Sequence, residues 1–254
     1  MTLDELLRTA SVRTADNGVV FSLPPGTDAD DRGLERMVSA VPRGLAARLG
    51  RTATYFVPWL VKVRRSVAVA LEPAPEGESR KELCHHLDVK PAGNLLLISL
   101  QFYEHDAYGL AMEFFDKIAY LAALDTGTNG DLEALLRRQL EAPAAGENAS
   151  GELTPDAWEY RSTWLGASAA KRAEAWQNYR RAAETDALGL YMAALFTDVF
   201  YEDLFEPESS FPQLSPEQLS ERLRAVERLY PPNRGYSLQL VRERPRRRRP
   251  AAGR

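Results

Sequence analysis

A group of charged side chains inside an apolar segment is the first candidate for chemistry in this chain of 254 residues. Glu113, Asp116 and Lys117 interrupt a run, from Leu110 to Leu121, in which apolar residues recur every three or four positions. These spacings bring the three charged side chains to one face of an α-helix, where the carboxylates could help to bind a cation. The simpler interpretation is an ion pair between Glu113 and Lys117 on the exposed face of a core helix.

The three histidines form a second group of candidate ligands. His85 and His86 directly follow the only cysteine, and His105 lies between two acidic residues. A hairpin could assemble these side chains, with Glu113 or Asp116 as the carboxylate, around a transition metal such as zinc. However, adjacent residues on a strand point to opposite faces, and no spacing here matches a structural zinc site. The alternative is that the histidines lie in loops or at a sheet edge.

The hydrophobic pattern predicts the elements that would position these groups. The short apolar run from Leu95 to Leu100 predicts a strand buried on both faces, and the helix with Glu113 follows it. Upstream, residues 19–23 and 52–71 also have strand-like patterns, whereas the downstream half has helical periodicity. The sequence therefore predicts an α+β fold, in which a small central sheet and an active-site-like helix precede a mostly helical half.

Capping residues mark where helices of the second half begin. Thr154 stands directly before a proline, which suits the first position of a helix. Ser215 and Gln218 have the spacing of a capping box. Residues 167–205 have a helical period, and we expect two helices that meet near Gly189.

The charge distribution separates a folded body from a basic tail. We predict one domain over residues 1–240, β-containing over 1–101 and helical over 102–240. Residues 241–254 carry a charge of +6, so the net charge of −4 leaves −10 for the body, which argues against a nucleic-acid-binding surface there. The tail is expected to be disordered and solvated. Alternatively, four of its arginines could bind the phosphates of nucleic acid, namely Arg246, Arg247, Arg248 and Arg249.

Composition also bears on the compartment of the protein. A single cysteine excludes an internal disulfide and fits a reducing environment. No apolar run approaches the length that crosses a bilayer, and Asp4 and Glu5 stand where a secretory signal would be basic. We therefore expect a cytoplasmic protein with no membrane partner.

A strand, a helix with a polar triplet and a helical second half together resemble the zincin group of zinc metallopeptidases, especially its lethal-factor-like branch, over residues 50–205. In that family the helix carries the motif HExxH, and a later helix supplies the third zinc ligand. The resemblance places Met112 to Asp116 at the motif and residues 185–196 on the later helix. It implies that Glu113 occupies the position of the general base and that Met112, Asp116 and Asp186 line the former cleft.

The same comparison of residues predicts that the metal has been lost. Two imidazoles on successive turns hold zinc in HExxH proteins, but Met112 and Asp116 stand at those two positions. A thioether is a poor ligand for zinc. The resemblance therefore implies a scaffold without its cofactor and without peptidase activity.

These observations lead to three hypotheses about function. The preferred one is a non-catalytic binding or scaffolding protein on a metallopeptidase-like fold, with no cofactor and with an unidentified protein or peptide as its partner. The second is a metal-dependent hydrolase that holds zinc through His85, His86 or His105 together with Glu113. The third is a helical interaction module that binds a partner through residues 190–205 and nucleic acid through its tail.

Overall fold

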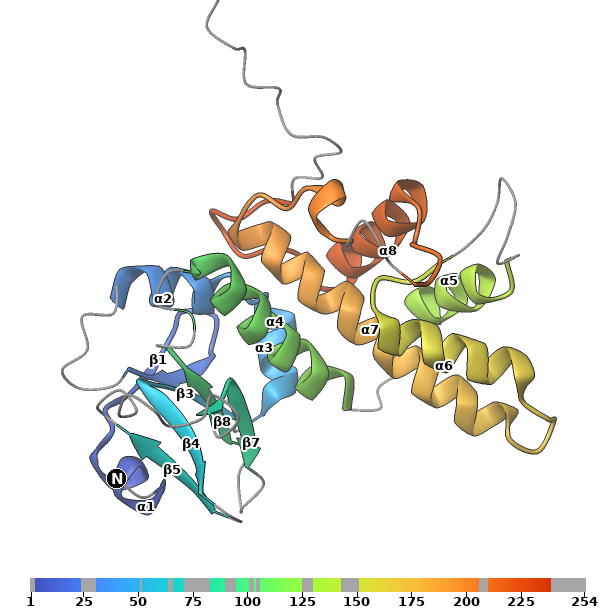
Figure 1. Ribbon diagram of the computed structural model, residues 1–254. Coiled ribbons are helices and arrows are strands. Elements are labelled where there is room, and N and C mark those ends of the chain that lie inside the picture. Colours follow the sequence, from blue (N-terminus) through green and yellow to red (C-terminus); the bar gives the residue numbers. More distant parts are fainter. Residues whose placement is uncertain are drawn as a thin grey trace, which may run out of the picture.

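The computed structural model describes residues 3–23, 31–50, 52–63, 66–70, 83–89, 95–100, 103, 106–124, 130–142, 151–205 and 210–238 (Figure 1). Its helices are α1 (Leu3–Thr9), α2 (Asp31–Ser39), α3 (Arg43–Ala46), η1 (Ala47–Leu49), α4 (Ala107–Leu124), α5 (Gly130–Leu140), α6 (Pro155–Gly166), α7 (Arg172–Phe196), η4 (Tyr201–Asp203) and α8 (Pro216–Leu229). Its strands are β1 (Val12–Thr14), β2 (Val20–Ser22), β3 (Ala53–Val57), β4 (Trp59–Val63), β5 (Ser66–Ala70), β6 (Leu83–Cys84), β7 (His86–Val89) and β8 (Leu95–Ser99).

A mixed sheet with the strand order β1-β2-β3-β8-β7 lies in the N-terminal half. Its three middle strands run parallel, and β1 and β7 are antiparallel edges. A smaller antiparallel sheet, in the order β5-β4-β6, begins where the chain leaves β3 at Pro58. The helices of the C-terminal half follow, so the predicted α+β fold is confirmed.

Strand β8 is buried on both faces, as its composition predicts. Its side chains alternate, so that Leu96 and Ile98 join the main core while Leu97 joins a smaller cluster beneath α1. All three are fully buried. The neighbouring strand β3 divides its residues in the same way, with Phe56 in the main core and Tyr55 in the smaller cluster.

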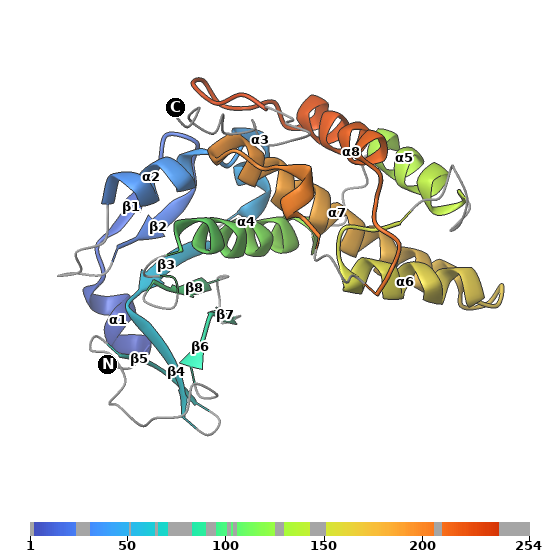
Figure 2. The same cartoon turned by 45° about the horizontal axis from the view of Figure 1, so that its top comes forward.

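Helix α4 lies between the sheet and α7 in both views (Figures 1 and 2). Towards the sheet, Phe114 packs on Phe56 with a distance of 5.7 Å between ring centroids. Towards α7, the backbone at Asp116 comes so close to Gly189 that a Cβ on this glycine would lie 3.5 Å from the Asp116 Cα. The small residue thus allows the two helix backbones to approach each other.

The expected junction between two helices near Gly189 is wrong. Helix α7 runs without a break from Arg172 to Phe196, and Gly189 lies inside it at the crossing with α4. The glycine serves a close approach between helices, so it does not end either of them. A glycine in a helical pattern cannot reveal from sequence alone which of these roles it has.

Both predicted helix starts are confirmed. The Thr154 side chain accepts a hydrogen bond from the Ala157 backbone N–H at the start of α6, and a proline occupies the first turn. At the start of α8, Ser215 and Gln218 form the reciprocal bonds of a capping box. The Thr154 cap fixes where α6 begins, beside the pockets described below.

The basic tail, with Arg246 to Arg249, lies outside the described residues. Among the helices that the structure describes, none is long and apolar enough to cross a bilayer.

Candidate functional site

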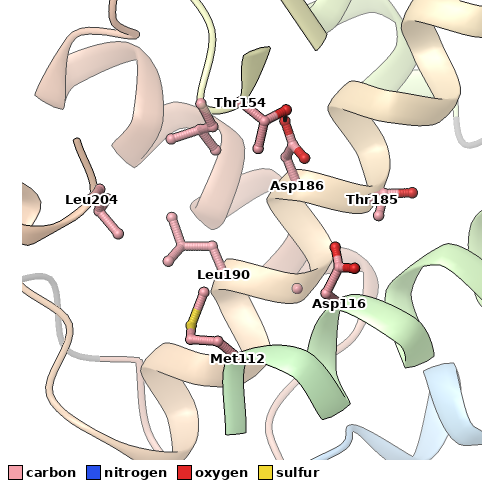
Figure 3. Close-up of a pocket in the computed structure, with 9 residues that line it drawn as sticks. Met112, Asp116, Thr154, Thr185, Asp186, Leu190 and Leu204 are labelled. Carbon is pink, nitrogen blue, oxygen red and sulfur yellow. Dashed lines mark hydrogen bonds between the residues drawn. The ribbon is translucent and has the colours of Figure 1, made fainter. Parts of the chain in front are cut away.

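Two adjoining pockets lie at the crossing of α4, α6 and α7, and Figure 3 shows the residues that line the smaller one. We call the smaller one, of about 140 Å³, the inner chamber, and the larger one, of about 380 Å³, the outer chamber. Four residues line both chambers: Asp116, Thr154, Thr185 and Asp186. The two chambers therefore form one continuous groove with a polar junction.

The inner chamber is apolar beyond this junction. Met112 from α4, Leu190 from α7 and Leu204 line one side of it (Figure 3). Leu153 and Gly189 complete its wall. A hydrocarbon group would exchange water for apolar contacts there.

The outer chamber carries charges of both signs. Asp156 at the start of α6 adds a third aspartate to the two at the junction, and Lys117 and Arg181 are its cations. Tyr120 and Tyr160, each about 40% exposed, stand at its edge. With all of these groups ionised, the groove has a net charge of −1.

The Asp186 carboxylate lies at the junction and accepts a 2.8 Å hydrogen bond from the Thr154 hydroxyl. Burial raises the pKa of Asp186 to about 7. The negative charges of Glu152 and Asp116 add to this increase, whereas the hydrogen bond from Thr154 and the charge of Arg222 oppose it. Asp186 is therefore a carboxyl group that changes its charge near neutral pH.

Asp116 faces the same junction from α4 and pairs with its chain neighbour. Its Oδ2 lies 2.7 Å from Nζ of Lys117. The structure therefore corrects the simple ion pair expected between Glu113 and Lys117, because the lysine turns to the nearer carboxylate. The Asp116 side chain is 46% exposed, so a ligand in the groove can reach it.

Thr185 has an unsatisfied hydroxyl at the junction. The residue is 8% exposed, and within the described part of the chain its Oγ1 has no hydrogen-bond partner. A buried hydroxyl without a partner costs about 1–3 kcal/mol. Buried polar groups are normally paired, so a missing partner in a pocket points to a ligand that supplies one.

A buried charged network fixes the wall behind this junction. Glu152 accepts hydrogen bonds from Arg161 (3.2 Å), Tyr179 (2.8 Å) and Arg222 (2.9 Å). The Glu152 and arginine side chains are fully buried. The network joins α6, α7 and α8 to the segment that leads into Thr154, so it positions the residue that bonds Asp186.

Hydrogen bonds to residues 212 and 214 also fix the backbone of Glu152. Its N–H donates to the Pro212 carbonyl at 3.0 Å, and its carbonyl accepts from the Leu214 N–H at 3.2 Å. A Cβ on the preceding Gly151 would lie 1.9 Å from the Pro212 oxygen. Only glycine fits at that position.

Glu113 lies apart from the groove and contacts strand β7. Its Oε1 lies 2.5 Å from Nδ1 of His86. Burial of the carboxyl favours its neutral form, but hydrogen bonding to His86, together with the charges of His86 and Lys117 and a bond from Tyr103, outweighs this effect and lowers the pKa of Glu113. His85 approaches the same cluster, with Nδ1 3.1 Å from the Tyr103 hydroxyl.

Replacing Glu113 by glutamine should destabilise the protein at neutral pH but not in acid. A carboxyl whose pKa is lowered by folding contributes stability above its unfolded pKa, and this contribution is lost as the pH falls through the folded pKa. We expect a loss of about 1–3 kcal/mol at pH 7. Urea unfolding at several pH values from 7 down to about 2 measures the loss at each pH, and a loss that does not shrink as the pH falls would contradict the account.

The structure separates the residues that sequence analysis suggested as one site. Met112, Asp116 and Asp186 line the inner chamber together, whereas Glu113 lines neither chamber. His85 and His86 lie on the sheet side of α4. His105 lies outside the described residues. Among the residues that the structure describes, no three His, Cys, Asp or Glu side chains come together as a potential metal site.

Three residues of the groove were not predicted from the sequence as members of a site. Thr154 was recognised as a helix cap, but its hydroxyl also donates to Asp186. Nothing in the sequence distinguished Thr185 or Arg181 from other polar residues of a long helix. The i, i+4 spacing of Arg181 and Thr185 would have placed these two on one face, but only knowledge of the α4 crossing identifies that face as a pocket wall.

No model of a protein family matches this sequence, and no match was found among curated proteins.

Proposed function

We propose that this chain is a non-catalytic binding protein whose groove takes a ligand with a positively charged amine next to an apolar group. Asp116 and Asp186, from two different helices, line both chambers together with Thr185, whose buried hydroxyl has no hydrogen-bond partner among the described residues. This juxtaposition is the observation that carries the proposal. The partner is a small amine, or a peptide or protein that presents such a group.

The charges at the junction support an ammonium group. An ammonium carries three donors, and the acceptors at the junction are two carboxylates and one hydroxyl. Charge-assisted hydrogen bonds are about twice as strong as neutral ones. The apolar wall formed by Met112, Leu190 and Leu204 would then receive the hydrocarbon attached to the nitrogen.

The arrangement also supports the proposed kinship with zincins. Strand β8 leads to α4, and α7 is the later helix that meets it. Met112 and Asp116 occupy the two ligand positions of the motif, and they line the same chamber as Asp186 from α7. Zinc does not fit this set of side chains, because it offers a thioether and two carboxylates with no imidazole. The proposal therefore contains no metal-dependent step.

Three compounds of equal length test the proposal by calorimetric titration at pH 8. We expect n-hexylamine to bind with a Kd of about 0.1–1 mM. Hexanol, which has no charge, and hexanoate, which has the opposite charge, should bind at least about tenfold more weakly. Binding of hexanol as tight as that of the amine, or no binding of the amine, would overturn the proposal.

Replacing Thr185 by valine should stabilise the free protein and weaken amine binding. The change removes a buried hydroxyl without a partner, so the free energy of unfolding should rise by about 1 kcal/mol. The same hydroxyl is available to the ligand, so the Kd for hexylamine should increase by about fivefold.

Thr52→Val is the matched control for this variant. The Thr52 hydroxyl is also buried and without a partner in the described residues, but it lies outside the groove. Its removal should stabilise the protein and leave the Kd for hexylamine unchanged. If both variants bind the amine as the wild type does, Thr185 does not contact the ligand.

A further inference from the structure

Arg181 in the outer chamber has a buried donor without an acceptor. Among the described residues, Nε of Arg181 has no hydrogen-bond partner, and no carboxylate lies within ion-pair distance of the side chain. Buried arginines normally pair with a carboxylate, as the preceding Arg180 does with Glu184 at 2.9 Å. A guanidinium presents a planar set of donors that matches a carboxylate. The chamber therefore offers a place for an anionic group of the ligand.

The positions of the two chambers determine where an anionic group of the ligand would lie relative to its amine. Asp116, Thr185 and Asp186 line both chambers, so an ammonium bound to them lies at the junction. The carbon that bears this ammonium can extend one arm into the apolar inner chamber and a second arm towards Arg181. An ammonium, a carboxylate and an apolar side chain on one carbon define an α-amino acid.

The inner chamber has a suitable size for the side chain. A cavity of about 150 Å³ lined by apolar side chains holds a benzene molecule. The inner chamber, of about 140 Å³, is therefore large enough for the side chain of leucine.

We propose that the groove recognises an α-amino acid with an apolar side chain. The inference rests on the proposed function and extends it by the carboxylate contact. The ammonium lies between Asp116 and Asp186, the carboxylate pairs with Arg181, and the side chain enters the inner chamber. A simple amine brings no carboxylate to Arg181, and a simple acid brings no ammonium to the two aspartates, so the amino acid should bind more tightly than either.

Calorimetric titration of the full chain at pH 8 compares L-leucine with its two halves. Isoamylamine is leucine without the carboxylate, and 4-methylpentanoate is leucine without the ammonium. We expect leucine to bind at least about tenfold more tightly than isoamylamine. In Arg181→Gln this preference should disappear, whereas Arg224→Gln, an equal loss of charge at an exposed position on α8, should retain it.

The outcomes separate the two proposals. If isoamylamine binds to the wild type as tightly as leucine does, the amino acid proposal is overturned while the amine-binding proposal stands. If Arg181→Gln keeps the preference for leucine and remains folded, the assignment of the carboxylate to Arg181 is wrong. If neither leucine nor isoamylamine binds, both proposals fail.

Discussion

Replacing Glu152 by glutamine is expected to lower the free energy of unfolding by about 3–5 kcal/mol, or to prevent folding altogether. The carboxylate is the counter-charge of Arg161 and Arg222, and all three side chains are fully buried. Glutamine has nearly the same shape but no charge, so two buried guanidinium groups would lose the carboxylate that they share. Urea unfolding monitored by circular dichroism measures the change.

Glu133→Gln provides the matched control. Glu133 pairs with Arg137 on α5 at 3.0 Å, at a spacing of four residues, and the arginine side chain is 47% exposed. Such helix-surface pairs contribute about 0.3–0.5 kcal/mol. Equal effects of the two substitutions would show that the buried network does not hold the C-terminal helices together.

Replacing Asp186 by asparagine is expected to stabilise the protein at alkaline pH and to have no effect in acid. Folding raises the pKa of this carboxyl from 3.8 to about 7, so the folded state favours the protonated form. The wild type therefore loses stability as the pH rises from about 4 to 7, and the loss is constant above that range. A shift of about three pKa units corresponds to at most about 4 kcal/mol, and access of solvent to the groove reduces it to about 2–4 kcal/mol.

Asparagine preserves the contact that the protonated acid makes, because its side-chain oxygen can still accept from the Thr154 hydroxyl. The experiment compares urea unfolding of the wild type and the variant at about pH 3.5, below both pKa values, and at pH 8. Asp16→Asn, at an exposed turn, should show no comparable difference between the two pH values. If Asp186→Asn is no more stable than the wild type at pH 8, burial does not destabilise the ionised carboxylate of Asp186.

The pattern of apolar residues predicted the parts of the fold that depend on local order. Strand β8 and helix α4 appear where the hydrophobic period changes, and Thr154 and Ser215 cap the helices that they were expected to cap. These features involve residues no more than four positions apart. Side-chain period and backbone hydrogen bonding determine them without reference to the rest of the chain.

The buried charges could not be predicted in the same way. Arg161 and Arg222 stand within helices, where an arginine is ordinarily a surface residue. Their common partner, Glu152, is separated from them by 9 and 70 positions. Only the packing of α6 and α8 brings the three together, and nothing in the local sequence of any one of them indicates burial.

Only part of the candidate site could be predicted, because helical spacing does not show which neighbouring element a side chain will face. Asp116 and Asp186 line one pocket, as the resemblance to zincins implies, but Glu113 turns to His86 on the edge strand β7. Residues 113 and 116 lie on neighbouring sides of one helix, and the spacing alone does not decide which of them faces the sheet. The Lys117 side chain then pairs with Asp116 because that carboxylate is nearer.

An amine-binding groove with Asp186 at its junction links affinity to pH. The ammonium favours the ionised carboxylate, and a pKa of about 7 means that about 10% of Asp186 is ionised at pH 6 and about 90% at pH 8. Burial is the main cause of this raised pKa, and Thr154, Arg222, Glu152 and Asp116 modify it. Hexylamine itself stays protonated throughout, as a lysine side chain does. The groove should therefore bind amines more tightly in alkaline solution.

The most direct measurement is the Kd for hexylamine at pH 6 and pH 8 in the wild type and in Asp186→Asn. The account predicts that the wild type binds roughly ninefold more tightly at pH 8, with release of a proton, and that the variant binds weakly and equally at both pH values. Equal affinity of the wild type at the two pH values, or unchanged affinity in the variant, would contradict it.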